Sequence, residues 1–231
     1  MGQLESRGYI ADGIENNYRN VSLEQRMELL KSPSPTDRTL GARLLMEYPG
    51  LPVINLLTGA LKTEKKLYPK LEICRTLASF GKDSVVPLVA LLGKLGSNQH
   101  TRVPAKDFRK TSYPLPRDIA ARTLIRIGSV ALPDLIWVLN GSDLVRLSEA
   151  IDTIGFICFY NYQPGVAGLL EECFYRNEKE ELIQWKIFRA MSAFPENIPF
   201  LQKQLVLSPE LFRPEIKRSL SLLKNKLPDN E

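Results

Sequence analysis

One helix-like segment occurs six times along the chain, and this repetition constrains the fold more than any single motif. Each copy is built around an anchor residue, with an apolar residue two positions later. The clearest copy reads ARTLIRIG, from Ala121 to Gly128. Neighbouring anchors are separated by 32, 47, 30, 37 and 29 residues. The anchors are Arg43, Arg75, Arg122, Asp152, Arg189 and Arg218.

Helix-breaking residues recur with the same register. The residue six positions after each of the first five anchors is, in order, Pro49, Gly81, Gly128, Cys158 and Pro195. A proline follows three to six positions later and leads into an apolar run; these prolines are Pro52, Pro87, Pro133, Pro164 and Pro199. Glycine and proline end helices, and proline is accepted in the first turn of the next one. The pattern therefore predicts two short helices per copy.

These helices need neighbours to cover their apolar faces. In the stretch IAARTLIRIG the apolar residues Ile119, Ala120, Leu124 and Ile127 recur at helical intervals. A single pair of helices buries only part of such a face, so successive pairs must stack.

The stacked pairs resemble HEAT repeats, which are armadillo-type α-solenoids. The resemblance is carried by the arrangement AA..L..IG....P.L...L and extends over residues 38–224; its residues are Ala120, Ala121, Leu124, Ile127, Gly128, Pro133, Leu135 and Leu139. It implies an all-α fold, a right-handed α-α superhelix of about five stacked helical hairpins. Because most HEAT-repeat proteins are scaffolds or adaptors, the resemblance also implies that role.

Composition divides the chain into three parts. Residues 1–20 are polar and are expected to be flexible, residues 21–227 form the repeat domain, and residues 228–231 are a polar tail. We expect a capping helix over residues 21–32 with Ser22 as its N-cap. The last helix is expected to begin after Ser208, with Pro209 in its first turn.

The spacing of 47 residues marks a single interruption, a loop over residues 96–116. It contains three prolines and the aromatic residues Phe108 and Tyr113. Long loops in compact folds are either functional or disordered. Residues 94–126 carry a net charge of +6, whereas residues 127–172 carry −5, so the molecule is electrically polarised. The basic loop is open to three interpretations: a solvated loop, a surface for an acidic protein partner, or a nucleic-acid contact.

Two tryptophans and several carboxylates are candidate site residues. Trp137 lies in the apolar run LIWVL and is expected in the core. Trp185 is also expected to be buried, with a surface anchor as the alternative. Adjacent carboxylates such as Glu171 and Glu172 do not converge on one point of a helix, so we expect a solvated face.

Composition argues against several classes of function. The chain has one histidine, His100, which excludes a histidine-rich metal site, and no nucleotide-binding or nucleophile motif occurs. We therefore expect no metal, no cofactor and no enzymatic activity. The cysteines Cys74, Cys158 and Cys173 have no metal-like spacing and are expected to be free buried thiols. With no membrane-length apolar stretch and a polar N-terminus, we expect a cytoplasmic protein.

The leading hypothesis is a non-catalytic module that binds a protein or peptide through a concave face of helices and the basic loop. The expected contact residues are Arg75, Arg102, Lys106, Arg109, Lys110, Arg122, Arg126, Trp185 and Arg189. Of these, Arg75, Arg122, Arg126 and Arg189 are expected at outward positions of the helices. One alternative is nucleic-acid binding by residues 94–126, as in the HEAT-like DNA glycosylases. The other is an enzyme similar to the HEAT-like bilin lyases.

Overall fold

The structure is a computed structural model and describes residues 2–18, 20–105 and 110–225. Every regular element in these ranges is helical, and no strand occurs there. Short 3₁₀ turns join several of the α-helices. The α-helices are α1 (Leu23–Leu29), α2 (Pro35–Leu44), α3 (Leu51–Thr63), α4 (Leu67–Ser79), α5 (Val85–Val89), α6 (Ile119–Ile127), α7 (Leu132–Val138), α8 (Leu144–Tyr160), α9 (Val166–Arg176), α10 (Glu181–Ala190), α11 (Ile198–Leu207) and α12 (Arg213–Lys224).

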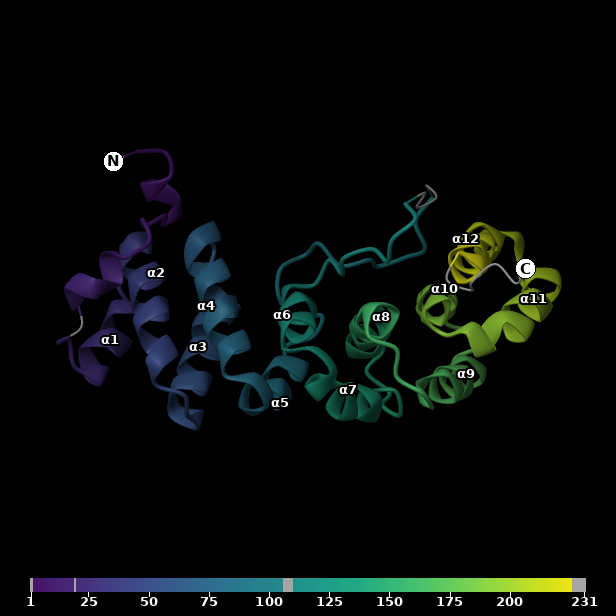
Figure 1. The fold of residues 1–231 in the computed structure, drawn as a ribbon. Coiled ribbons are helices and arrows are strands. Elements are labelled where there is room, and N and C mark those ends of the chain that lie inside the picture. Colours follow the sequence, from purple (N-terminus) through teal and green to yellow (C-terminus); the bar gives the residue numbers. More distant parts are fainter. Residues whose placement is uncertain (1, 19, 106–109, 226–231) are drawn as a thin grey trace.

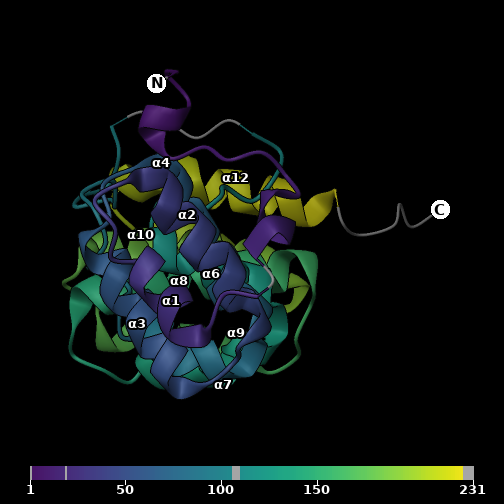
Figure 2. The same cartoon turned by 90° about the vertical axis from the view of Figure 1, so that its left-hand side faces the viewer.

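The helices lie in two rows that follow the chain from one end of the molecule to the other (Figure 1). Each odd-numbered helix packs against the even-numbered helix that follows it. The even-numbered helices α2 to α12 also contact one another in order along their row. Viewed along the molecule, α4, α10 and α12 lie above α3, α7 and α9 (Figure 2).

The sequence pattern accounts for where many of these helices begin and end. All six anchors fall on even-numbered helices, from Arg43 on α2 to Arg218 on α12. Gly128 closes α6 with a φ of 84°, a backbone conformation that glycine adopts without strain. Prolines occupy the first turns of α3, α7 and α11, as predicted. The Ser22 side chain caps α1 in a full capping box with Gln25, which confirms that assignment.

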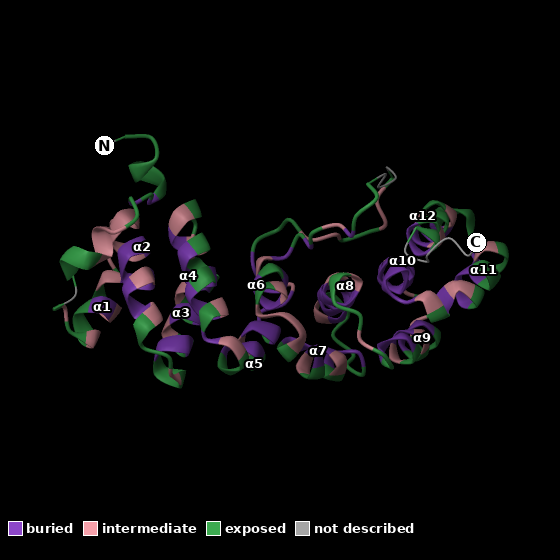
Figure 3. Cartoon of the chain, in the orientation of Figure 1, coloured by how far each residue is buried: buried purple, intermediate pink, exposed green. Residues whose placement is uncertain are grey.

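One continuous apolar core runs through the array, from Leu30 near α1 to Leu223 in α12. Figure 3 shows buried residues on the sides of the helices that face their neighbours. Helix α10 is enclosed most completely, since every residue from 183 to 190 is buried. Among the described residues, no helix combines the length and the apolarity that crossing a membrane requires.

The N-terminal segment lies against α2. Ile10 packs with Leu40 and Leu44 in a small apolar cluster beside the main core. The Thr39 hydroxyl donates a hydrogen bond of 2.7 Å to the backbone oxygen of Gly8. These contacts tie residues 8–10 to the first helices of the array.

Two expectations about individual segments were wrong. Trp137 is 73% exposed, because Leu135, Val138 and Leu139 form the buried stripe of α7 and the tryptophan falls outside it. The last helix begins at Arg213 rather than after Ser208, with a 3₁₀ turn over Glu210–Phe212 before it.

Candidate functional site

The described parts of the 96–116 loop extend toward the C-terminal helices and rest on them (Figure 1). Tyr113 is buried by the contact, and its ring packs 6.0 Å from Phe156 and 5.6 Å from Phe159 of α8, centroid to centroid. A Cβ atom at Gly155 would collide with the Tyr113 hydroxyl and would lie 2.9 Å from Cα of Ala190. Only glycine at this position lets the loop, α8 and α10 approach so closely.

A second contact holds the loop against α12. The Arg218 guanidinium on α12 donates hydrogen bonds to the backbone oxygens of Lys110 and Ser112, at 3.3 and 3.4 Å. The loop is therefore attached to α8 through an aromatic side chain and to α12 through its own backbone.

A cavity of about 560 Å³ lies between this loop and helices α8 and α10, and we call it the Trp185 cavity. Its size is in the range of known ligand pockets. Its aromatic lining comprises Tyr113, Phe156, Tyr160 and Trp185. Its ionisable lining comprises His100, Lys110, Arg117, Asp152 and Arg189.

The wall of the cavity continues into a buried ion cluster. The Lys186 ammonium lies 2.7 Å from Oε1 of Glu149 and 2.8 Å from Oδ2 of Asp152. Arg189 lies 3.8 Å from Oδ1 of Asp152 and 3.4 Å from Oε1 of Glu215. Three carboxylates and three cations make up the cluster, namely Glu149, Asp152, Lys186, Arg189, Glu215 and Arg218. Because the charges balance, the cluster is tolerated in the interior.

The cluster sets the ionisation of its carboxylates. Burial alone would raise the pKa of Asp152, but the charges of Lys186 and Arg189 outweigh it and hold that pKa below its ordinary value. Burial raises the pKa of Glu149, and the Lys186 charge opposes that rise only in part. Asp152 is therefore an ionised carboxylate at neutral pH, held between two cations.

Trp185 is packed on two sides. The Arg189 guanidinium lies over its ring at 3.9 Å from the centroid, a cation–π contact. The His100 ring meets the indole edge-on at 5.2 Å. Burial lowers the pKa of His100 to about 4; the Asp152 charge opposes this shift, and the nearby arginines and Lys186 act in the same direction as burial. The imidazole is therefore neutral at physiological pH.

Two buried polar atoms of cavity-lining residues have no hydrogen-bond partner among the described residues. They are the Tyr113 hydroxyl and Oδ1 of Asp152. Burial raises the pKa of Tyr113 well above its ordinary value, so the hydroxyl remains a neutral donor. Buried polar atoms in proteins are normally satisfied, so these two are exceptions in the wall of the cavity.

The structure brings three of the expected contact residues together, because Lys110, Trp185 and Arg189 all line the cavity. Arg189 was expected to point outward, and that was wrong: it is 4% exposed because Asp152 on α8 and Glu215 on α12 compensate its charge. The remaining described residues of the set are exposed and lie outside this cavity; they are Arg75, Arg102, Arg122 and Arg126. Lys106 and Arg109 lie outside the described residues.

Sequence reasoning missed His100, Tyr113 and Asp152 as lining residues. One signal for Asp152 was present, since it is the only acidic anchor among six. An acidic side chain in the apolar stretch AIDTIG needs a buried cation, and Lys186 lies in the next anchor-bearing helix.

Comparisons with known proteins give few matches. No protein-family model matches the chain, and no curated protein matches it. Two solved structures, both described as engineered proteins, are 17% identical in sequence and cover 88% of this chain. The alignments cover 96% and 99% of those chains, with TM-scores of 0.43 and 0.38.

Proposed function

We propose that the chain is a HEAT-like α-solenoid that serves as a non-catalytic scaffold or adaptor for a protein partner. The order of contacts between helices supports the solenoid, because each odd-numbered helix packs on the next even-numbered one and the even-numbered helices follow in line. The match between six sequence anchors and six even-numbered helices supports it independently. The number of hairpins in this proposal is six rather than about five.

The observation that carries the binding role is the Trp185 cavity. Aromatic and cationic side chains are enriched at the centres of protein interfaces, and this cavity combines both. Two apolar residues of its lining are open to solvent, Tyr160 at 59% and Leu115 at 51% exposure. A partner side chain entering the cavity would cover both and would meet Lys110 at the loop.

The ionisable groups here suit a binding site better than a catalytic one. Lys186 is fully enclosed and contacts two carboxylates, so its ammonium is held as a structural cation. Asp152 is kept ionised by two cations, which makes it a poor proton acceptor at neutral pH. These charges stabilise the wall of the cavity and position Arg189 over Trp185.

We also propose that the protein works in a reducing compartment such as the cytoplasm. Cys74, Cys158 and Cys173 are all buried and free, as is usual for proteins of that environment.

Affinity capture from the native cell tests the binding role. The double variant Leu115→Ser and Tyr160→Ala removes the exposed apolar lining of the cavity. We expect it to lose the main captured partner, since apolar anchors supply much of the affinity of an interface. The matched control is Leu211→Ser with Tyr175→Ala, two residues that are also exposed but do not line the cavity. Equal capture by both double variants would contradict the proposal.

A further inference from the structure

A second hollow, beside the Trp185 cavity, is strongly basic. This basic cleft has a volume of about 790 Å³ and lies between the α3–α4 connection and the start of α6. Lys62, Lys65 and Lys70 line it from the α3–α4 side, and Arg117 and Arg122 line it from the α6 side. The first three lie in the stretch KTEKKLYPK, far in sequence from the basic loop.

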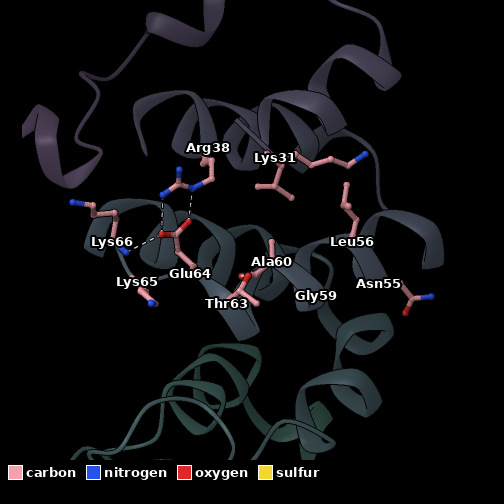
Figure 4. A pocket seen from close by; sticks show the side chains of 11 residues that line it. Lys31, Arg38, Asn55, Leu56, Gly59, Ala60, Thr63, Glu64, Lys65 and Lys66 are labelled. Carbon is pink, nitrogen blue, oxygen red and sulfur yellow. Dashed lines mark hydrogen bonds and ion pairs between the residues drawn. The ribbon is translucent and has the colours of Figure 1, made fainter. Parts of the chain in front are cut away.

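The carboxylates next to the cleft are already engaged. Glu64 lines it, but both of its oxygens bond the Arg38 guanidinium, at 2.7 and 3.1 Å. Figure 4 shows this pair in a neighbouring pocket, which Arg38, Glu64 and Lys66 all line. The Lys66 backbone amide donates a hydrogen bond to the same Glu64 carboxylate. Asp118 is buried and caps α6, accepting hydrogen bonds from the backbone amides of Gly93 and Ala121.

The five cations that line the cleft therefore keep most of their charge for a ligand. Within the described part of the chain, none of them forms an ion pair with a carboxylate. Five positive charges around one hollow repel each other, and a bound anion would relieve that repulsion.

The rest of the lining indicates which anion fits. Leu61, Leu95 and Ile119 contribute the apolar part, and none of the lining residues that the structure describes is aromatic. Single-stranded nucleic acids are normally held by stacking of bases on aromatic rings, which the described lining does not offer. Carboxylate side chains interspersed with aliphatic ones match a lining of cations and aliphatic residues.

The cleft and the Trp185 cavity meet at Arg117, which lines both. An extended segment lying in the cleft can therefore continue into the cavity. The Arg122 guanidinium is held in position by a hydrogen bond of 2.6 Å from its Nε to the backbone oxygen of Pro116, just before Arg117.

We propose that the basic cleft binds an extended acidic peptide segment of the partner, with aliphatic residues between its carboxylates. This inference rests on the proposed function, because it names the chemistry of the partner that the scaffold would hold. The carboxylates would pair with the five cations while the aliphatic side chains contact the partly exposed Ile119.

Fluorescence anisotropy with defined probes tests the inference. The probe is a labelled twelve-residue peptide of eight glutamates and four leucines, titrated with the intact chain at about 50 mM salt, where exposed charges are weakly screened. The cleft variant is Lys62→Gln, Lys65→Gln and Lys70→Gln. The control variant is Lys203→Gln, Lys217→Gln and Lys224→Gln, which removes the same charge from exposed positions on α11 and α12.

We expect the cleft variant to bind the probe about tenfold more weakly than the unmodified chain, and the control variant to stay within about twofold. A peptide with serines in place of the leucines should bind more weakly than the probe. Equal losses in the two variants would overturn the inference, because the attraction would then be a property of net charge. Tighter binding of a twelve-nucleotide oligothymidylate than of the probe would also overturn it, in favour of nucleic acid.

These outcomes are separate from the test of the proposed function. If the cleft variant still captures the cellular partner while the Leu115→Ser and Tyr160→Ala variant does not, the scaffold stands and the acidic-segment inference falls. If the cleft variant loses probe binding while no partner depends on the Trp185 cavity, the cleft stands as a peptide site and the proposed role of the cavity falls.

Discussion

The guanidinium of Arg189 lies over the indole ring of Trp185, 3.9 Å from its centroid, and both side chains project from α10. The same guanidinium contacts Asp152 on α8 and Glu215 on α12. One side chain thus connects three successive even-numbered helices and forms part of the wall of the Trp185 cavity. Stability of the C-terminal half and the shape of the cavity therefore depend on the same charges.

Removing the central cation should destabilise the fold strongly. Lys186→Met leaves Glu149 without its cation and Asp152 with Arg189 alone. Because an uncompensated buried charge is costly, we expect a loss of about 3–5 kcal/mol in the free energy of unfolding. Urea denaturation followed by circular dichroism measures it. Lys179→Met, at an exposed position, should change it by less than about 0.5 kcal/mol; a similar small change for Lys186→Met would refute the structural role of the cluster.

Substitution by alanine should change the stability of the fold in opposite directions at two glycines of successive helices, Gly155 on α8 and Gly168 on α9. Gly155→Ala places a methyl group against Tyr113 and the backbone of Ala190, so we expect a loss of about 1–3 kcal/mol. Gly168→Ala on α9 meets no atom within 4 Å and should stabilise the fold by up to about 1 kcal/mol. Thermal unfolding of both variants checks the pair. If Gly155→Ala were as well tolerated as Gly168→Ala, the loop would not be seated on α8 as described.

His100 should titrate well below an ordinary histidine. Burial lowers its pKa from 6.5 to about 4, so the folded protein binds this proton less readily than the unfolded chain. The free energy of unfolding should therefore fall as pH decreases from 6.5 toward 4, and His100→Gln should flatten that dependence. Because the chain has one histidine, a proton NMR titration of the imidazole reports it without ambiguity. An apparent pKa near 6.5 would show that His100 is not packed against Trp185 as described.

The three cysteines should react slowly with thiol reagents in the folded protein. Burial raises the pKa of Cys158 to about 12 and also raises the pKa values of Cys74 and Cys173. Since the thiolate is the reactive form, we expect little modification by an aromatic disulfide reagent at neutral pH. Addition of denaturant should release all three thiols. Rapid reaction of any of them without denaturant would contradict the packing of its helix.

Much of the fold could be predicted from local signals. The anchors located the even-numbered helices, and Gly128 and Pro133 located the turn between α6 and α7, because these residues act on their own segment of backbone. Trp137 was misplaced because a short apolar run does not reveal which of its residues faces outward; Leu135 and Val138 define the buried side.

The site was harder to predict because it depends on contacts between distant segments. Tyr113 reaches the cavity only because the loop returns over Gly155. Arg189 is buried only because carboxylates on two other helices lie beside it. Neither fact is a property of the residue's own neighbourhood in sequence, so helical periodicity alone assigned Arg189 to the surface.

Site-specific photo-crosslinking tests the central claim most directly, because it reports what touches the Trp185 cavity in the cell. A benzophenone amino acid is placed at Tyr160, which lines the cavity, and separately at Tyr175, which is comparably exposed on α9. We predict one discrete crosslinked partner from position 160, identified by mass spectrometry and lost when Leu115→Ser is added, and no such product from position 175. The same products from both positions, or none from position 160, would contradict the account.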